Sequence, residues 1–71
     1  MSVKEWYVEK EDAQRAYDTD RISRETYELR TRFAIGMIHK CGKKGDKEAA
    51  KRMADAHGYD IKELIDFANG K

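Results

Sequence analysis

The 71-residue sequence contains no proline, one cysteine and no long apolar run. Proline interrupts helices, so its absence, together with the lack of alternating β-branched stretches, favours helices throughout. The single cysteine, Cys41, excludes an intramolecular disulfide and fits a reducing compartment. No stretch approaches the roughly 18–20 apolar residues of a membrane span, and no basic lead followed by an apolar run marks a signal peptide. We therefore expect a cytoplasmic protein without a membrane partner.

Charged residues make up 41% of the chain and hydrophobic residues 39%, which is enough apolar content for folding. We expect one domain over residues 1–71, near the lower size limit for independent folding. A core of this size supplies roughly 3–5 kcal/mol of net stability. Such chains often gain stability from an interface, so a protein partner is expected, and a homodimer is an open alternative.

The first half of the chain predicts a helical hairpin over residues 3–41. Apolar residues at three-to-four spacing indicate a helix over 3–17, and Ser2 with Glu5 has the spacing of a capping box. A polar turn and a Ser23 cap precede a second helix over 24–41. Its glycine, Gly36, is expected to let another helix approach closely. The expected buried face comprises Leu29, Phe33, Ala34, Met37, Ile38 and Cys41, with Tyr27 on its flank.

The second half predicts a basic loop over residues 42–45 and a pair of helices over residues 46–69. Asp46 is the expected cap of the first helix of this pair, and Gly58 its left-handed stop. Asp60 is the expected cap of the last helix, which ends before Asn69. Its apolar stripe comprises Ile61, Leu64, Ile65 and Ala68, with Phe67 displaced from it. The predicted fold class is thus all-α, a compact bundle of about four helices.

Groups that would support catalysis or metal binding are few. The only serines, Ser2 and Ser23, are explained as helix caps. His39 and Cys41 are two residues apart on one helix, so they point about 160° away from each other and do not form a metal-binding pair. The short chelating spacings of structural zinc sites are absent. We expect no enzyme activity, no metal and no cofactor.

Residues 47–71 contain Met53, Ala54, Gly58 and Tyr59 at a helix–turn–helix spacing. This segment resembles the helix-turn-helix of phage-repressor and Cro-type regulators. The resemblance implies that Ala54 allows close helix packing, that Gly58 forms the turn, and that Leu64 and Phe67 point inward. It also implies that Ile61 and Ile65 are presented outward. His57 departs from the pattern, because the family usually has an apolar residue there.

The same resemblance implies DNA binding as the alternative function. Eight basic residues against two acidic ones make the segment 30–52 strongly positive, although the whole chain has a net charge of only +1. However, Asp60, Glu63 and Asp66 on the would-be recognition helix would repel phosphates. A solvated surface is the competing interpretation of the basic residues. The residues expected near DNA or an acidic surface are Lys43, Lys44, Lys47, Lys51 and Arg52 for phosphates, and Lys62, Asp66 and Asn69 for bases.

Residues 10–33 carry Tyr17, then Ile22-Ser23, then Glu25-Thr26-Tyr27. These elements resemble the SHOCT domain, a short helical hairpin associated with oligomerisation. The resemblance implies a hairpin between the first two helices. The family usually has glycine in the turn, and this chain has Asp18 to Arg21 instead.

The expected function is that of a small regulator that binds a protein partner stoichiometrically, as an inhibitor or adaptor of the compact kind encoded by phages and mobile elements. Tyrosine and tryptophan are over-represented at binding hot spots, and isoleucines on the outer face of an acidic helix would add apolar contact area. Nucleic acid is the alternative partner. The residues expected to bind the protein partner are Trp6, Tyr7, Tyr59, Ile61 and Ile65.

Overall fold

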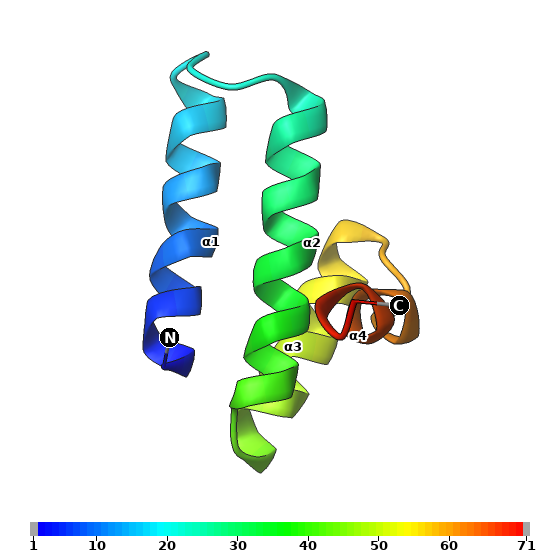
Figure 1. Ribbon diagram of the computed structural model, residues 1–71. Helices are drawn as coiled ribbons and strands as arrows, with labels where there is room; N and C mark the ends of the chain where they lie inside the picture. The colour runs from blue at the N-terminus through cyan, green and yellow to red at the C-terminus, as the bar shows by residue number, and fades with distance from the viewer. Residues whose placement is uncertain (1, 71) are drawn as a thin grey trace.

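The computed structural model describes residues 2–70, which form four helices and no strand. The helices are α1 (Val3–Asp18), α2 (Arg24–Cys41), α3 (Lys44–His57) and α4 (Ile61–Ala68). Helices α1 and α2 run antiparallel, side by side, and α3 and α4 lie against the C-terminal half of α2 (Figure 1). The predicted all-α fold class is confirmed.

The helix ends follow local signals at most positions. The Ser23 hydroxyl accepts a hydrogen bond from the Thr26 N–H at 3.2 Å, and the Asp60 carboxylate accepts one from the Lys62 N–H at 3.0 Å. Gly58 ends α3 in the left-handed region, with φ 77°. These three predictions are confirmed. Ser2 precedes α1 as expected, but its side chain makes no capping hydrogen bond, so the predicted capping box is wrong.

The predicted loop over residues 42–45 is too long, because α3 begins at Lys44. Asp46 lies inside the helix rather than before it. From there its Oδ2 atom reaches back to accept a hydrogen bond from the Lys43 N–H at 3.1 Å. Asp46 thus bonds the N–H of the residue before the helix, whereas a capping side chain would bond N–H groups within the first turn.

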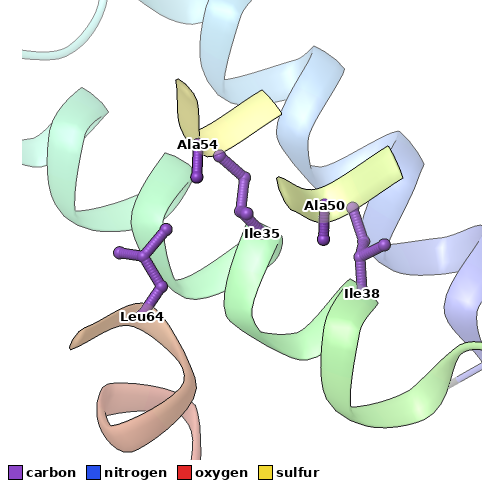
Figure 2. Packing of buried hydrophobic residues seen from close by; sticks show 5 residues of the cluster. All are labelled: Ile35, Ile38, Ala50, Ala54 and Leu64. Atoms are coloured by element: carbon purple, nitrogen blue, oxygen red, sulfur yellow. The ribbon is translucent and has the colours of Figure 1, made fainter. Parts of the chain in front are cut away.

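The core forms where α2, α3 and α4 converge. Its buried cluster contains two isoleucines from α2, two alanines from α3 and one leucine from α4 (Figure 2). The alanines have short side chains, so α3 approaches α2 closely enough to bury both isoleucines completely. The cluster comprises Ile35, Ile38, Ala50, Ala54 and Leu64.

The predicted buried face of α2 is wrong at two positions. Leu29 is 55% exposed and Cys41 is exposed, whereas Thr31 and Ile35 are buried. The reason is that α2 packs against all three other helices, so its buried positions do not follow one stripe. The role predicted for Gly36 is confirmed: a Cβ atom there would lie 2.4 Å from the carbonyl oxygen of Leu64, on α4.

Helix α4 packs mainly against α2, and only weakly against α3. Its predicted stripe is confirmed, with Leu64 buried and Ile61 and Ile65 half-buried. Two orientations implied by the repressor resemblance are wrong. Phe67 is 38% exposed rather than inward, and Ile61 packs against the core cluster rather than outward. Both follow from the placement of α4 over Gly36 of α2. No helix in the described part of the chain is long and apolar enough to cross a membrane.

Candidate protein-binding surface

An incompletely covered aromatic surface lies where α1, α2 and α4 meet. Leu29 and Phe33 are four residues apart on α2, so they share one face of that helix. The antiparallel α1 brings Trp6 against Phe33, with ring centres 5.4 Å apart, and α4 brings Phe67 against Phe33 at 5.5 Å. Both ring pairs meet edge to face, a favourable aromatic geometry. We call Trp6, Leu29, Phe33 and Phe67 the aromatic groove.

The aromatic groove consists of two pockets. Leu29 and Phe67 line both of them and form a ridge between them. On the α1 side, a pocket of about 290 Å³ is lined by these two residues with Trp6 and Phe33. On the α4 side, a pocket of about 490 Å³ is lined by the same two residues with Tyr59 and others. Two hollows beside a central ridge give a surface that a complementary surface could fill from both sides.

Apolar exposure is concentrated at this ridge. Three large hydrophobic residues in the described part of the chain are exposed: Leu29 at 55%, Val8 at 46% and Phe67 at 38%. Two of the three belong to the aromatic groove, whereas Val8 lines another pocket with Lys4, Glu5 and Glu9. Exposed apolar residues that adjoin each other, unlike scattered ones, are typical of interaction sites.

The rim of the aromatic groove carries opposite charges on its two walls. On α2, Arg32 lies over the Tyr59 ring, with its guanidinium carbon 4.8 Å from the ring centre, and Arg30 pairs with Glu9 of α1 at 3.6 Å. On the α4 side, Asp60 and Glu63 line the larger pocket and are exposed. Arg32 also pairs with Glu28 at 4.0 Å, so the α2 side carries paired arginines, whereas the α4 side carries carboxylates that form no ion pair within residues 2–70. An apolar centre with a charged, solvated rim is the usual anatomy of a protein interface.

One polar atom at the aromatic groove has no partner. The Nε1 atom of Trp6 is buried, and no acceptor in the described part of the chain bonds to it. A buried donor without an acceptor costs about 1–3 kcal/mol. The ring is thus held by apolar packing and not by a hydrogen bond.

The predicted anchors divide between the aromatic groove and the interior of the fold. Trp6 and Tyr59 line its two pockets, and Tyr59 also stacks on His57 at 5.3 Å. Tyr7 instead donates its hydroxyl to Asp46 Oδ1 at 3.0 Å, which links α1 to the start of α3. Burial and this contact raise the pKa of Tyr7. Ile61 and Ile65 are half-buried and are not among the residues that line the two pockets.

Sequence reasoning did not propose Leu29, Phe33 or Phe67 as binding residues. Leu29 and Phe33 were expected to be buried, because their spacing matches an ordinary core stripe. The displacement of Phe67 from the apolar stripe of α4 was the available signal. An aromatic residue beside the stripe, rather than within it, lies at the edge of the buried face.

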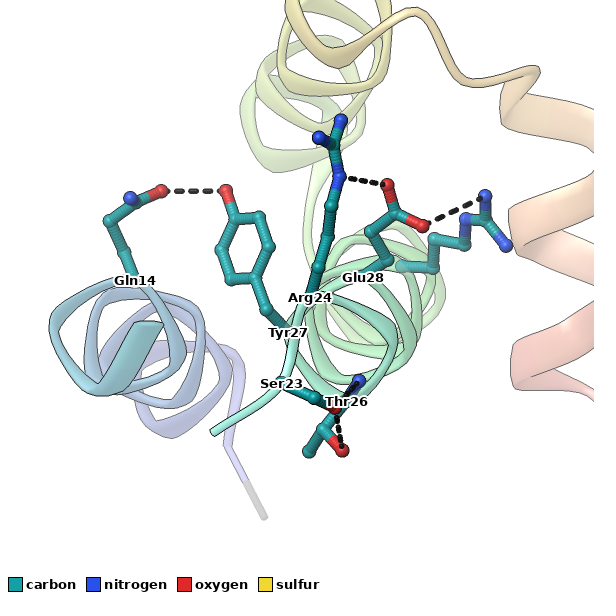
Figure 3. Close-up of polar contacts among 7 residues, drawn as sticks. Gln14, Ser23, Arg24, Thr26, Tyr27 and Glu28 are labelled. Carbon is teal, nitrogen blue, oxygen red and sulfur yellow. Dashed lines mark hydrogen bonds and ion pairs between the residues drawn. The ribbon is translucent and has the colours of Figure 1, made fainter. Parts of the chain in front are cut away.

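The other aromatic pair is closed by its own contacts. The Tyr17 and Tyr27 rings stack at 4.6 Å near the tip of the α1–α2 hairpin. The Tyr27 hydroxyl donates to Gln14 Oε1 at 2.6 Å, and nearby Arg24 pairs with Glu28 at 3.3 Å (Figure 3). Burial raises the pKa of Tyr27. The Tyr27 hydroxyl is therefore bonded within the chain, unlike the Nε1 atom of Trp6.

The predicted basic residues extend from the junction of α2 and α3 to the middle of α3. The Lys47 ammonium group donates a hydrogen bond to the carbonyl oxygen of His39 at 2.6 Å. Its positive charge therefore offsets the partial negative charge at the C-terminal end of α2. Burial, with the charges of Lys47 and Lys51, lowers the pKa of His39. The remaining predicted residues are exposed: Lys43 and Lys44 at the junction, Lys51 and Arg52 in the middle of α3, and Lys62, Asp66 and Asn69 on or after α4.

Within residues 2–70, no three His, Cys, Asp or Glu side chains lie close enough together to hold a metal ion. Comparison of the chain with protein-family models, curated proteins and solved structures finds no match. The resemblances to repressor-type helix-turn-helix proteins and to the SHOCT domain therefore stay predictions.

Proposed function

We propose that this protein is a small regulator that binds another protein stoichiometrically, without catalysis, and acts by covering part of that partner. The observation that supports the proposal is the aromatic groove, in which Leu29 and Phe67 are exposed beside the half-buried rings of Trp6 and Phe33. We place this activity in the cytoplasm, where a lone cysteine stays reduced. An origin in a phage or mobile element rests on size and the repressor resemblance alone.

The energetics of such binding depend on the ridge. Burial of apolar surface contributes roughly 25 cal/mol per Å², and large aromatic anchors at the centre of an interface dominate affinity. Leu29 and Phe67 provide that surface at little cost in ordering, because both are on helices. The charged rim would set orientation and association rate more than affinity.

The test is affinity capture from host lysate with immobilised wild-type protein, Leu29→Asp and Val8→Asp. Each substitution places a charge at an exposed apolar position, so circular dichroism should show all three folded. The wild type and Val8→Asp should retain the same protein, and Leu29→Asp should lose it. Equal retention by all three would rule out the aromatic groove as the binding surface.

DNA binding is the second candidate, supported by the exposed basic residues around the α2–α3 junction. It is the weaker proposal, because Lys47 is engaged with the α2 carbonyl, and α4 carries two exposed carboxylates and is capped by a third. A gel shift with random duplex would show micromolar binding that falls steeply with salt. Absence of a shift at low salt would remove this candidate.

A further inference from the structure

We infer that, in the free protein, the aromatic groove of one copy covers the aromatic groove of a second copy in a two-fold symmetric dimer. This inference goes beyond the proposed function and does not depend on any other partner. It rests on the two exposed apolar residues of the aromatic groove and on the charges of its rim.

A symmetric interface requires a surface that is complementary to itself, because each copy presents the same patch. The two walls of the larger pocket meet this requirement. Arg32 is on the α2 wall, and Asp60 and Glu63 are on the α4 wall. Neither carboxylate forms an ion pair within residues 2–70.

A two-fold axis that runs along the aromatic groove, between these walls, places α2 of each copy opposite α4 of the other. Arg32 of one copy then faces Glu63 of the second copy, and the same contact occurs twice. The ridge residues follow the same rule, so Leu29 of one copy meets Phe67 of the second copy. The arrangement gives Glu63 an arginine partner and covers both exposed ridge residues at once.

The size of the chain favours self-association. A chain of 71 residues is close to the size at which oligomerisation commonly supplements a small core. Self-association would compete with any partner that uses the same surface.

The first experiment is sedimentation velocity over a range of concentrations. The wild type, of 8.3 kDa per chain, should approach twice that mass as its concentration rises. Leu29→Asp should weaken the dimer by at least about tenfold, because it buries a charge at the centre of the interface. Val8→Asp is the matched control, since Val8 is similarly exposed but lies outside the aromatic groove, and it should leave the dimer unchanged.

A charge exchange tests the symmetry itself. Arg32→Glu and Glu63→Arg should each weaken the dimer, because each places like charges opposite one another. An equal mixture of the two variants should recover dimers, since both contacts in the mixed dimer then pair opposite charges. The recovery should fade at high salt. A variant that merely failed to fold would not be rescued by the other.

Trp6, the only tryptophan, lines the smaller pocket, so its fluorescence should change with the same concentration dependence as the mass. A wild type that stays monomeric up to about 1 mM would overturn the inference. A dimer that survives Leu29→Asp, or a mixture that recovers nothing, would also overturn it. If the protein is monomeric but still captures a partner, only the dimer inference is overturned. If it forms a dimer but captures no partner, only the proposed function is overturned.

Discussion

Two apolar surfaces of α2 have different fates in this fold. One surface contains Ile35 and Ile38, which are fully buried against the alanines of α3. The other contains Leu29 and Phe33, and there Leu29 is 55% exposed. The difference lies in what covers each surface: α3 and Leu64 of α4 lie directly over the isoleucines, whereas α4 reaches Phe33 through Phe67 and leaves Leu29 uncovered. Apolar content alone therefore does not decide burial; a side chain is buried only where a neighbouring helix lies over it.

The largest effect should come from a substitution that empties the closed surface. Ile35→Ala removes a completely buried side chain, and we expect a loss of about 2–5 kcal/mol in the free energy of unfolding. Leu29→Ala, on the open surface, should change it by less than about 1 kcal/mol. Urea denaturation followed by circular dichroism measures both. Similar losses for the two variants would mean that the two surfaces are buried alike.

The contact of α4 with α2 should be the next most sensitive. Gly36→Ala places a Cβ atom 2.4 Å from the Leu64 carbonyl oxygen and 2.9 Å from the Ala68 Cβ atom. The resulting displacement of α4 should cost about 1–3 kcal/mol, more than the gain of about 1 kcal/mol in helix propensity. Gly45→Ala is the matched control, because nothing lies within 4 Å of its Cβ position, and it should be neutral or stabilising. Stabilisation by both substitutions would show that α4 does not pack closely.

A smaller effect is expected where α1 is held to α3. Tyr7→Phe removes the hydrogen bond to Asp46 and should lower the free energy of unfolding by about 0.5–1.5 kcal/mol. Tyr27→Phe removes the bond to Gln14 at the hairpin tip and provides a comparison within the same hairpin. Thermal melts of each tyrosine variant, of the variant with its partner replaced by alanine, and of the double variant would isolate the two pair energies. If the effects of the Tyr7 and Asp46 substitutions on stability simply add in the double variant, the Tyr7 bond contributes nothing.

The smallest effect is a pH dependence from the two histidines. Burial lowers the pKa of both His39 and His57 below 6.5, the value expected for the unfolded chain. Above pH 6.5 both histidines are neutral in the folded and unfolded states, so they do not affect stability. As the pH falls below 6.5, the unfolded state binds protons first, so the free energy of unfolding decreases. Urea midpoints on both sides of this value should show the decline. In the double variant His39→Gln/His57→Gln this part of the decline should vanish, and an unchanged profile would assign it to other groups.

Local signals predicted much of this fold. Ser23, Asp60 and Gly58 mark helix ends because each satisfies backbone groups within its own segment, which is visible in sequence. Asp46 misled the prediction, since an acidic residue inside the first turn and one before it look alike in sequence. The choice between Leu29 and Ile35 as buried residues depended on where α3 lies, and periodicity within α2 carries no such information.

The aromatic groove could not be predicted, because its members come from three helices. Trp6 and Phe33 meet through the hairpin, which sequence reasoning did anticipate. Phe67 joins them only because α4 crosses α2 at Gly36, and the repressor resemblance implied a different orientation. Local spacing gives the face of a helix but not the direction in which that helix crosses another.

The central position of α2 has a consequence for how the chain reaches its native state. Helix α2 contacts every other helix, and it is joined to α1 by five residues and to α3 by two. Most native contacts thus form by closing short loops, and proteins of this kind fold in microseconds to milliseconds. The docking of α4 is the main contact between helices that are not neighbours in the chain. We therefore expect α4 to join last, with Gly36→Ala speeding its unfolding and leaving the folding rate nearly unchanged.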